Sequence, residues 1–317
     1  MPSAERRIPV VKVEHAVGLA KQRSSSYVGS RRRAMVLLLA PALCVLTIVT
    51  LGPLLYLLVT SFTALDLTRA ESFRFVGPDN YRNLLRDSRF WNSVTVQFKL
   101  SAATVSGQLA FGLGLALLLN RPMRLRELVR TGFVVPMVLP PIIVAIIWKI
   151  LFTPLLTPMN LFTLPLGFQQ PSWLTDPRLA LWTIIVADVW EWLPFTTLIL
   201  LAALQMIPEE PLEAARVDGA SGWQRFLAIV LPLLRPALAV AGLFRLIDSF
   251  KAFPLIFVMT GGGPGVVTEP TNYYAYTQAF NFTFIGYSSA MIVVMLLVTM
   301  TLSGAVMRLP GLQPDVE

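Results

Sequence analysis

Six long apolar runs constrain the fold of this chain more than any other feature of its sequence. They cover residues 34–65, 94–119, 129–152, 179–204, 236–259 and 286–307. Each run has the roughly 20 residues that a helix needs to cross the hydrocarbon core of a bilayer. The composition agrees, because 55% of the 317 residues are hydrophobic and 14% are charged, whereas about a quarter of residues are charged in soluble domains. The sequence therefore predicts an all-α, polytopic integral membrane protein with six transmembrane helices.

The polar segment before the first run predicts a tail rather than a signal peptide. Residues 1–33 carry eight Lys or Arg residues and end in three consecutive arginines. The uncharged run 34–65 is far longer than the apolar segment of a signal peptide, so we expect it to remain as a membrane anchor. We expect residues 1–33 to form a disordered cytoplasmic tail, residues 34–308 the transmembrane domain and residues 309–317 a cytoplasmic C-terminal tail.

The distribution of positive charge predicts the orientation in the membrane. With the N-terminus placed inside, sixteen Lys and Arg residues fall on the cytoplasmic side and six on the outer side. Short cytoplasmic loops carry the excess of Lys and Arg in membrane proteins. Both termini are therefore expected in the cytoplasm. The net charge of +8 is thus explained by topology, and we expect no nucleic-acid partner.

Scarce residue types exclude most catalytic and metal chemistry. The chain has one cysteine, Cys44, so it has no intrachain disulfide. Its one histidine, His15, lies in the polar tail, so the membrane core holds no histidine-based zinc site and no Ser–His–Asp triad. It also lacks the GxxxxGK[ST] loop that binds nucleotide phosphates. We expect no metal, no cofactor and no ATPase site in this chain, so any ATP must be bound by another subunit.

One predicted cytoplasmic loop, residues 205–235, is long enough to hold structure of its own. Prolines and acidic residues at 208–213 are typical of a helix start, and Gly219 and Gly222 are expected to end the helix. A second amphipathic stretch, residues 223–231, leads to further prolines. From composition alone, an interfacial linker is an equally good interpretation.

The same loop carries a family pattern. EAA at positions 213–215 is followed, after three residues, by Gly219 and, after nine more, by the sequence IVLP at 229–232. This pattern resembles the EAA loop of ABC-importer membrane permeases. The sequence GGGP at 261–264 resembles the carbohydrate-uptake, maltose-type branch. The resemblance assigns coupling to the ATPase subunit to Glu213, Ala214, Ala215, Asp218 and Gly219.

The resemblance covers about residues 34 to 308 and implies the type I ABC-importer permease fold. It implies a permease subunit of an ATP-driven importer for a sugar, polyol or related hydroxylated solute, forming half of the translocation path. The implied partners are a second homologous permease, two copies of an ATP-binding subunit that holds ATP and Mg²⁺, and an extracytoplasmic solute-binding protein. The implied location is a bacterial plasma (inner) membrane.

Five charged residues inside the fourth and fifth runs need an explanation, because a charge at the bilayer centre costs about 2.5–3.5 kcal/mol on insertion scales. They are Asp188, Glu191, Arg245, Asp248 and Lys251. Spacings of three and four residues place each group on one helical face. Two interpretations stay open: a purely structural set of ion pairs, or a wet cavity where carboxylates and guanidinium bind hydroxyls and aromatic rings stack on sugars.

The resemblance places the solute path on these two faces. The residues concerned are Asp188, Glu191, Trp192, Phe195, Arg245, Asp248, Ser249 and Ala252. Charges here depart from the maltose-type pattern, which favours a smaller, densely hydroxylated solute, with a phosphorylated polyol left open by Arg245. The alternative is a proton-coupled secondary transporter that uses Asp188 or Glu191. The EAA pattern and the absence of a visible inverted repeat argue against it.

Overall fold

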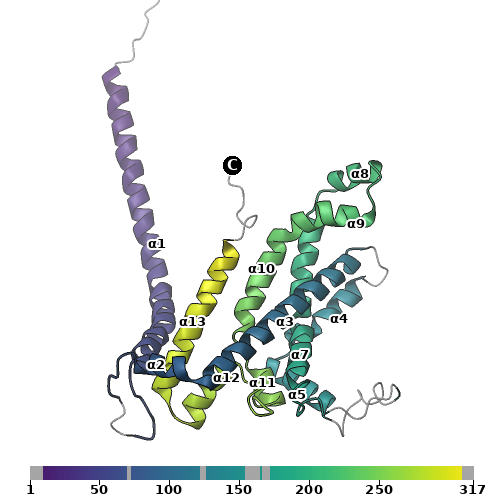
Figure 1. Cartoon of the computed structure of the whole chain (residues 1–317). Helices are drawn as coiled ribbons and strands as arrows, with labels where there is room; N and C mark the ends of the chain where they lie inside the picture. The colour runs from purple at the N-terminus through teal and green to yellow at the C-terminus, as the bar shows by residue number, and fades with distance from the viewer. Residues whose placement is uncertain (1–9, 70–72, 122–125, 154–164, 166–171, 309–317) are drawn as a thin grey trace, which may run out of the picture. The chain divides into compact units, whose positions relative to one another are not determined.

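The computed structural model describes residues 10–69, 73–121, 126–153, 165 and 172–308 (Figure 1). The described residues form helices joined by turns and contain no strand, only two isolated bridges that join Thr63 to Phe75 and Asp66 to Phe284. The all-α prediction is therefore confirmed for this part of the chain. The chain divides into two compact units, residues 1–57 and residues 58–317.

Unit 1 consists of most of helix α1, Val10–Ser61. Its apolar part, Met35–Ser61, is long enough to cross a membrane, and none of its most apolar window is buried. The helix begins at Val10, inside the tail for which we predicted disorder. Residues 10–33 contain no proline, so no residue in this stretch interrupts the backbone hydrogen bonds of the helix. Residues 1–9 and the predicted C-terminal tail 309–317 lie outside the described residues.

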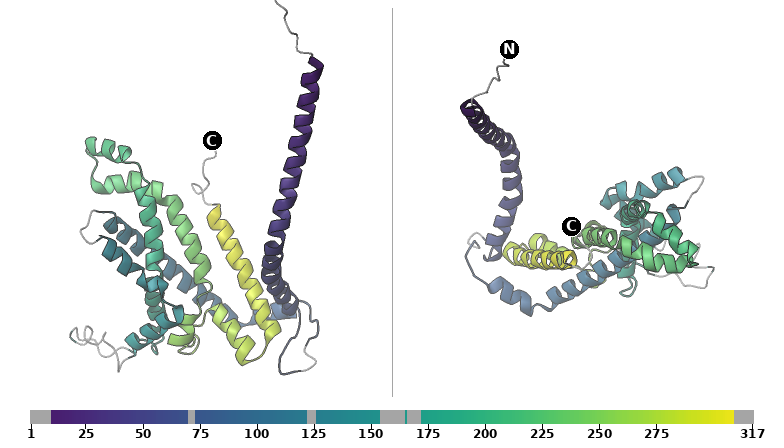
Figure 2. Two further views of the ribbon diagram at one scale, coloured as in Figure 1. Left: turned by 180° about the vertical axis from the view of Figure 1, so that it is seen from behind. Right: turned by 90° about the horizontal axis from the view of Figure 1, so that it is seen from above.

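Unit 2 holds the remaining helices, with α8 and α9 together at one end and α2 and α11 at the opposite end (Figures 1 and 2). The helices are α2 (Asp79–Arg86), α3 (Ser88–Leu119), α4 (Arg126–Val138), α5 (Pro141–Phe152), α7 (Ala180–Gln205), α8 (Glu210–Val217), α9 (Gly222–Arg225), the π-helix η1 (Phe226–Val230), α10 (Leu231–Ser249), α11 (Pro254–Met259), α12 (Thr271–Tyr276), the π-helix η2 (Thr277–Asn281) and α13 (Ile285–Met307). Five helical segments of the described chain can span a membrane, or six if one bent pair counts as a span.

That bent pair corrects the third predicted span, residues 129–152. The chain there forms two helical pieces, Thr131–Val138 and Pro141–Phe152, that meet at an angle of 100°. Two consecutive prolines, Pro140 and Pro141, lie at the break. They provide no backbone N–H, and the residue before a proline is pushed out of the helical conformation.

The fifth predicted span, residues 236–259, is also discontinuous. Helix α10 ends at Ser249, and the short helix α11 begins at Pro254. At its other end, α10 follows α9 and η1 without a gap, so the amphipathic stretch 223–231 continues directly into α10. The wide turn of η1, where the Leu231 N–H donates to the Phe226 carbonyl, accommodates the prolines that follow.

Side-chain amides satisfy the backbone where α10 stops. The Gln97 Nε2 atom lies 3.1 Å from the Ser249 carbonyl oxygen, and the Asn272 Nδ2 atom lies 2.6 Å from the Ala252 carbonyl oxygen. Non-helical backbone at membrane depth is tolerated where protein buries it and supplies such partners. The amide at position 97 therefore has a structural explanation: it helps to make a break in α10 possible.

Helix α3 packs closely along α7 in the interior of unit 2. A Cβ atom added at Gly112 would lie 2.9 Å from the Thr196 Cγ2 atom, so only glycine allows this approach, as is usual where membrane helices meet. The close approach brings polar residues of α3, α7 and α10 together.

Candidate functional site

The helical pair at one end of unit 2 protrudes and is uncovered. Neither α8 nor α9 has a buried residue, and the side chains of Val217 and Trp223 are 88% and 68% exposed. Gly219 has φ +80°, so it makes the turn that the sequence predicted, in a conformation that side chains with a Cβ resist. Ser221 and Gln224 then form a capping box that starts α9. The EAA residues thus lie on an exposed helix that ends in a tight turn.

A buried polar cluster joins three helices. The Gln108 Nε2 atom of α3 lies 2.8 Å from Asp188 Oδ1 on α7, and Arg245 Nε of α10 lies 2.8 Å from Gln108 Oε1. The other two guanidinium nitrogens of Arg245 point to carboxylates, Nη1 at 2.8 Å from Asp248 Oδ2 and Nη2 at 3.4 Å from Asp188 Oδ1. Ion pairs therefore form both within α10 and from α10 to α7, which agrees with the structural interpretation of these charges.

The face of the guanidinium is occupied as well. The Cζ atom of Arg245 lies 4.5 Å from the centre of the Trp192 ring, within the range of a cation–π contact. The Arg245 side chain is 2% exposed, and Asp188 is 6% exposed, whereas Asp248 is 42% exposed. The cluster therefore has a closed inner part around Arg245 and an open side formed by Asp248.

A cavity of about 170 Å³ lies against this open side. Its walls come from the middle of α7 and the end of α10, and from the two places where helices are broken. The lining residues are Asp188, Glu191 and Trp192 of α7, Arg245, Asp248, Lys251 and Ala252 at the end of α10, and Pro141, Phe253, Pro254 and Leu255 at the starts of α5 and α11. Broken helices that enclose a polar cavity are typical of solute sites in transporters.

Six of the eight predicted solute-path residues line this cavity, and Phe195 and Ser249 do not. Phe195 packs against the rings of Trp192 and Phe244, with ring centres 6.4 and 6.3 Å apart. Ser249 terminates α10, with its hydroxyl donating to the Leu246 carbonyl. Both lie on the predicted helical face. Beyond the end of α10, the cavity is lined instead by Phe253, Pro254 and Leu255 at the start of α11.

Sequence reasoning overlooked Gln108, which joins Arg245 to Asp188. The available signal was an amide in the middle of an apolar helix, where an unsatisfied polar group is costly. It also missed the cavity walls at Pro141 and Pro254, because the pattern gave no sign that two broken helices meet there.

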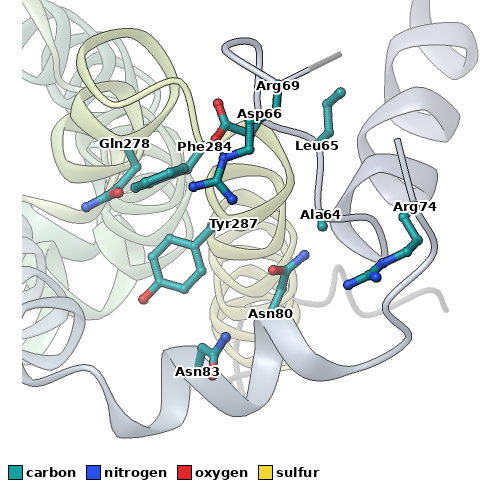
Figure 3. A pocket seen from close by; sticks show the side chains of 10 residues that line it. All are labelled: Ala64, Leu65, Asp66, Arg69, Arg74, Asn80, Asn83, Gln278, Phe284 and Tyr287. Atoms are coloured by element: carbon teal, nitrogen blue, oxygen red, sulfur yellow. Dashed lines mark ion pairs between the residues drawn. The ribbon is translucent and has the colours of Figure 1, made fainter. Parts of the chain in front are cut away.

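A second cavity, of about 620 Å³, lies in unit 2 near α2 and the start of α13 (Figure 3). Its lining residues are Ala64, Leu65, Asp66, Arg69, Arg74, Asn80, Asn83, Gln278, Phe284 and Tyr287. Several of its polar groups hold the walls together. Asn80 donates to the Ser61 and Thr63 carbonyls, and Thr283 donates to Asp66. No predicted site residue lines this cavity.

The architecture of unit 2 defines a class of protein. Apolar helices that can cross a membrane, two of them broken around a buried polar cavity, together with a protruding helical pair, are the parts of a membrane transport subunit. The chain belongs to the family described as binding-protein-dependent transport system inner membrane component, whose sequence profile matches residues 108–309. It is thus an ABC-importer permease subunit, as the EAA pattern indicated.

Curated relatives agree over most of their length. The chain is 36% identical to the sulfoquinovosyl glycerol transport system permease protein SmoG of Agrobacterium fabrum, covering 88% of this chain and 90% of SmoG. It is 39% identical to the trehalose/maltose transport system permease protein MalF of Thermococcus litoralis, covering 67% and 72%. It is 33% identical to the trehalose transport system permease protein SugA of Mycobacterium tuberculosis, covering 85% and 88%.

The fold also matches a solved transporter. A chain of the bacterial alginate ABC transporter in complex with alginate pentasaccharide-bound periplasmic protein superposes with a TM-score of 0.78 at 21% identity, covering 90% of this chain and 98% of that one. The family and the named relatives make the chain a transport subunit and not an enzyme, and ATP hydrolysis belongs to a partner subunit. The proton-coupled alternative finds no support in these comparisons.

Proposed function

We propose that this permease imports a sugar, polyol or related hydroxylated solute, and that the cavity beside Asp188, Glu191 and Trp192 is its half of the membrane path. The observation that carries the proposal is the placement of this cavity between two broken helices, with carboxyl groups and an indole ring on its walls. Such groups bind hydroxyls and stack on sugar rings. The relatives named for trehalose, maltose and sulfoquinovosyl glycerol support a glycoside-like solute.

The exposed pair α8 and α9 is the proposed contact with the ATPase. Small side chains at Ala214 and Ala215 allow a helix to approach a groove closely, and the turn at Gly219 presents that helix at the end of unit 2. Glu213 and Asp218 offer charges to the partner. We infer that one of the two copies of the ATP-binding subunit docks here and that these copies alone bind ATP and Mg²⁺. We also infer that this end of unit 2 faces the cytoplasm and that both termini lie on that side.

The remaining partners follow from the incomplete path. The cavity is open on one side within this chain, so a second permease subunit is proposed to close it. An extracytoplasmic solute-binding protein is proposed to deliver the solute at the opposite end, near α2 and α11. A transporter of the same fold was crystallised in complex with a periplasmic protein that holds an alginate pentasaccharide.

The test is ATP-dependent uptake by the assembled complex in proteoliposomes supplied with its binding protein. Trp192→Ala removes a cavity wall and is expected to lower uptake at least tenfold at unchanged complex yield. Trp182→Ala is the matched control, because Trp182 is on the same helix, is 60% exposed and lies outside the cavity. Equal uptake by the two variants would show that the cavity is not the path.

A further inference from the structure

The segment around α2, at the opposite end of unit 2 from α8, is rich in arginine. Arginines lie at positions 69, 74, 82, 86 and 89, although membrane proteins keep most Lys and Arg in cytoplasmic loops. Arg82 pairs with Asp79, and Arg89 pairs with Glu269. The arginines at 69 and 74 instead line the 620 Å³ cavity of Figure 3, and the proposed solute path uses neither of them.

Two guanidinium groups are available to a ligand in this cavity. Figure 3 shows Arg69 and Arg74 on either side of Asn80. The Arg69 side chain is 80% exposed, and its ion pair with Asp66 is 3.5 Å long and uses Nε rather than the two terminal nitrogens. Arg74 is exposed and forms no ion pair with another residue of the described chain. Arginine pairs favour an anion with several oxygens, and guanidinium matches phosphate best.

The carboxylate on the cavity wall leaves room for such an anion. The Oδ1 atom of Asp66 accepts from the Thr68 N–H at 2.9 Å, from the Thr68 hydroxyl at 2.7 Å and from the Thr283 hydroxyl at 2.8 Å. These donors hold the carboxylate against the protein, and the charge of Arg69 offsets its own. Arg74 is therefore the excess positive charge of the lining.

The cavity lies at the depth where two membrane spans end. Met35–Ser61 and Ile285–Met307 are both long and apolar enough to cross a membrane. The Gly286 N–H donates to the Leu65 carbonyl at 3.0 Å, so the end of one span and the start of the other are tied together. The cavity residues Leu65 and Phe284 lie directly beyond these ends. Because spanning helices leave the hydrocarbon there, the cavity is at the level of the lipid headgroups.

Large apolar side chains around the cavity are exposed. Leu67, Phe73, Phe75 and Leu85 are 66%, 64%, 76% and 67% exposed, and they alternate along the sequence with the arginines. Apolar side chains next to Lys or Arg are typical of protein segments that lie in the headgroup–acyl boundary. The surroundings of the cavity therefore favour a lipid over a free anion from the solution.

We propose that this cavity binds the phosphate of an anionic phospholipid of the outer leaflet, with Arg69 and Arg74 on the phosphate oxygens. The choice of leaflet follows from the proposed orientation, with α8 and α9 in the cytoplasm. The site goes beyond the proposed function, because the lipid takes no part in the solute path. Phosphatidylglycerol offers hydroxyls to the amide of Asn83, which also lines the cavity, whereas phosphatidylethanolamine adds an ammonium that the guanidinium groups repel.

The test is photo-cross-linking from inside the cavity. Phe284, 44% exposed and on the cavity wall, is replaced by p-benzoylphenylalanine in the permease–ATPase complex. The complex is placed in nanodiscs that hold equal amounts of phosphatidylglycerol and phosphatidylethanolamine with the same acyl chains, and the lipid adducts are counted by mass spectrometry. We expect at least five times more phosphatidylglycerol adduct. The same probe at Trp182, 60% exposed on α7, should show no such preference.

Two double variants then assign the preference to the cavity. Arg69→Gln with Arg74→Gln should abolish it at unchanged complex yield, because both side chains are exposed. Arg82→Gln with Arg86→Gln removes the same number of charges from α2, outside the cavity, and should preserve it. An equal loss in both double variants would overturn the site in favour of general surface charge.

The remaining outcomes concern the identity of the ligand. An adduct at 284 without headgroup preference, or no lipid adduct, would overturn the proposal. So would the replacement of the lipid adduct by an adduct to the solute-binding protein when that protein is added, because the cavity would then be a protein-docking surface. Each of these results leaves the proposed solute path untouched, since that path is tested separately by uptake in Trp192→Ala.

Discussion

Replacing Asp188 tests whether its carboxylate holds the helices together by balancing the charge of Arg245. The Asp188→Ala substitution removes the acceptor of the Gln108 amide and one of the two carboxylates of Arg245. The guanidinium, 2% exposed, cannot turn to water. Removing one member of a buried ion pair costs about 3–5 kcal/mol, which is a large part of the stability of a typical folded domain. Asp188→Ala should therefore reduce the amount of assembled complex strongly.

The matched double variant shows whether the stranded charge is the cause. Asp188→Leu combined with Arg245→Met removes both charges and keeps apolar volume, so complex yield should recover relative to Asp188→Leu alone. Asp248→Asn, at a side chain 42% exposed, retains an acceptor for Arg245 and should lower uptake with little loss of yield. Yield and uptake are measured on the same preparation. Normal yield in Asp188→Ala, with no gain in the double variant, would refute the view that Asp188 balances Arg245.

Three further predictions concern the turn at Gly219, the absence of a nucleotide-binding loop from the sequence, and Asp87 at the opposite end of unit 2. Gly219→Val forces a β-branched residue to φ +80°, so co-purification of the ATPase subunit and uptake should fall while membrane insertion persists; intact uptake would refute docking at this turn. The purified chain without partners should not hydrolyse ATP, and measurable turnover free of partner protein would contradict this. At the opposite end, burial raises the pKa of Asp87, but hydrogen bonds from Tyr287 and Tyr274 outweigh it and hold this pKa below its usual value. This stabilisation is present above pH ~4 and is lost as pH falls through the lowered pKa, so the melting temperature should drop there, and Asp87→Asn should remove that part of the pH dependence.

The sequence predicted well wherever one local rule decides the outcome. Hydrophobic length placed the first, second, fourth and sixth spans. The third is a bent pair of helices, and the fifth runs from Gly222 to Ser249 instead of over residues 236–259. Gly219 was predicted to turn the chain because glycine alone adopts positive φ freely, and it does. The spacing placed Arg245 and Asp248 on one face of the same helix, and their side chains do pair there.

The sequence failed where distant residues decide the structure. A proline pair at 140–141 can kink a helix or end it, and only the packing of α5 against its neighbours selects the 100° bend. The end of α10 at Ser249 depends on the amides of Gln97 and Asn272, which are 152 and 20 residues away from the carbonyls they satisfy. Such partners cannot be paired from one sequence, so the cavity could be predicted in its charges but not in its shape.

Accessibility of the cavity during transport tests the central claim most directly. In a Cys44→Ser background, which removes the chain's only cysteine, Ala252→Cys places a thiol on the cavity wall, and Val186→Cys places one on the surface of α7, where the native side chain is 45% exposed. The complex is labelled with a small, charged thiol reagent during ATP turnover, with and without saturating solute. The account predicts rapid labelling at 252 that solute slows, and slow labelling at 186 that solute does not change. Labelling at 252 that is no faster than at 186, or that solute leaves unchanged, would contradict it.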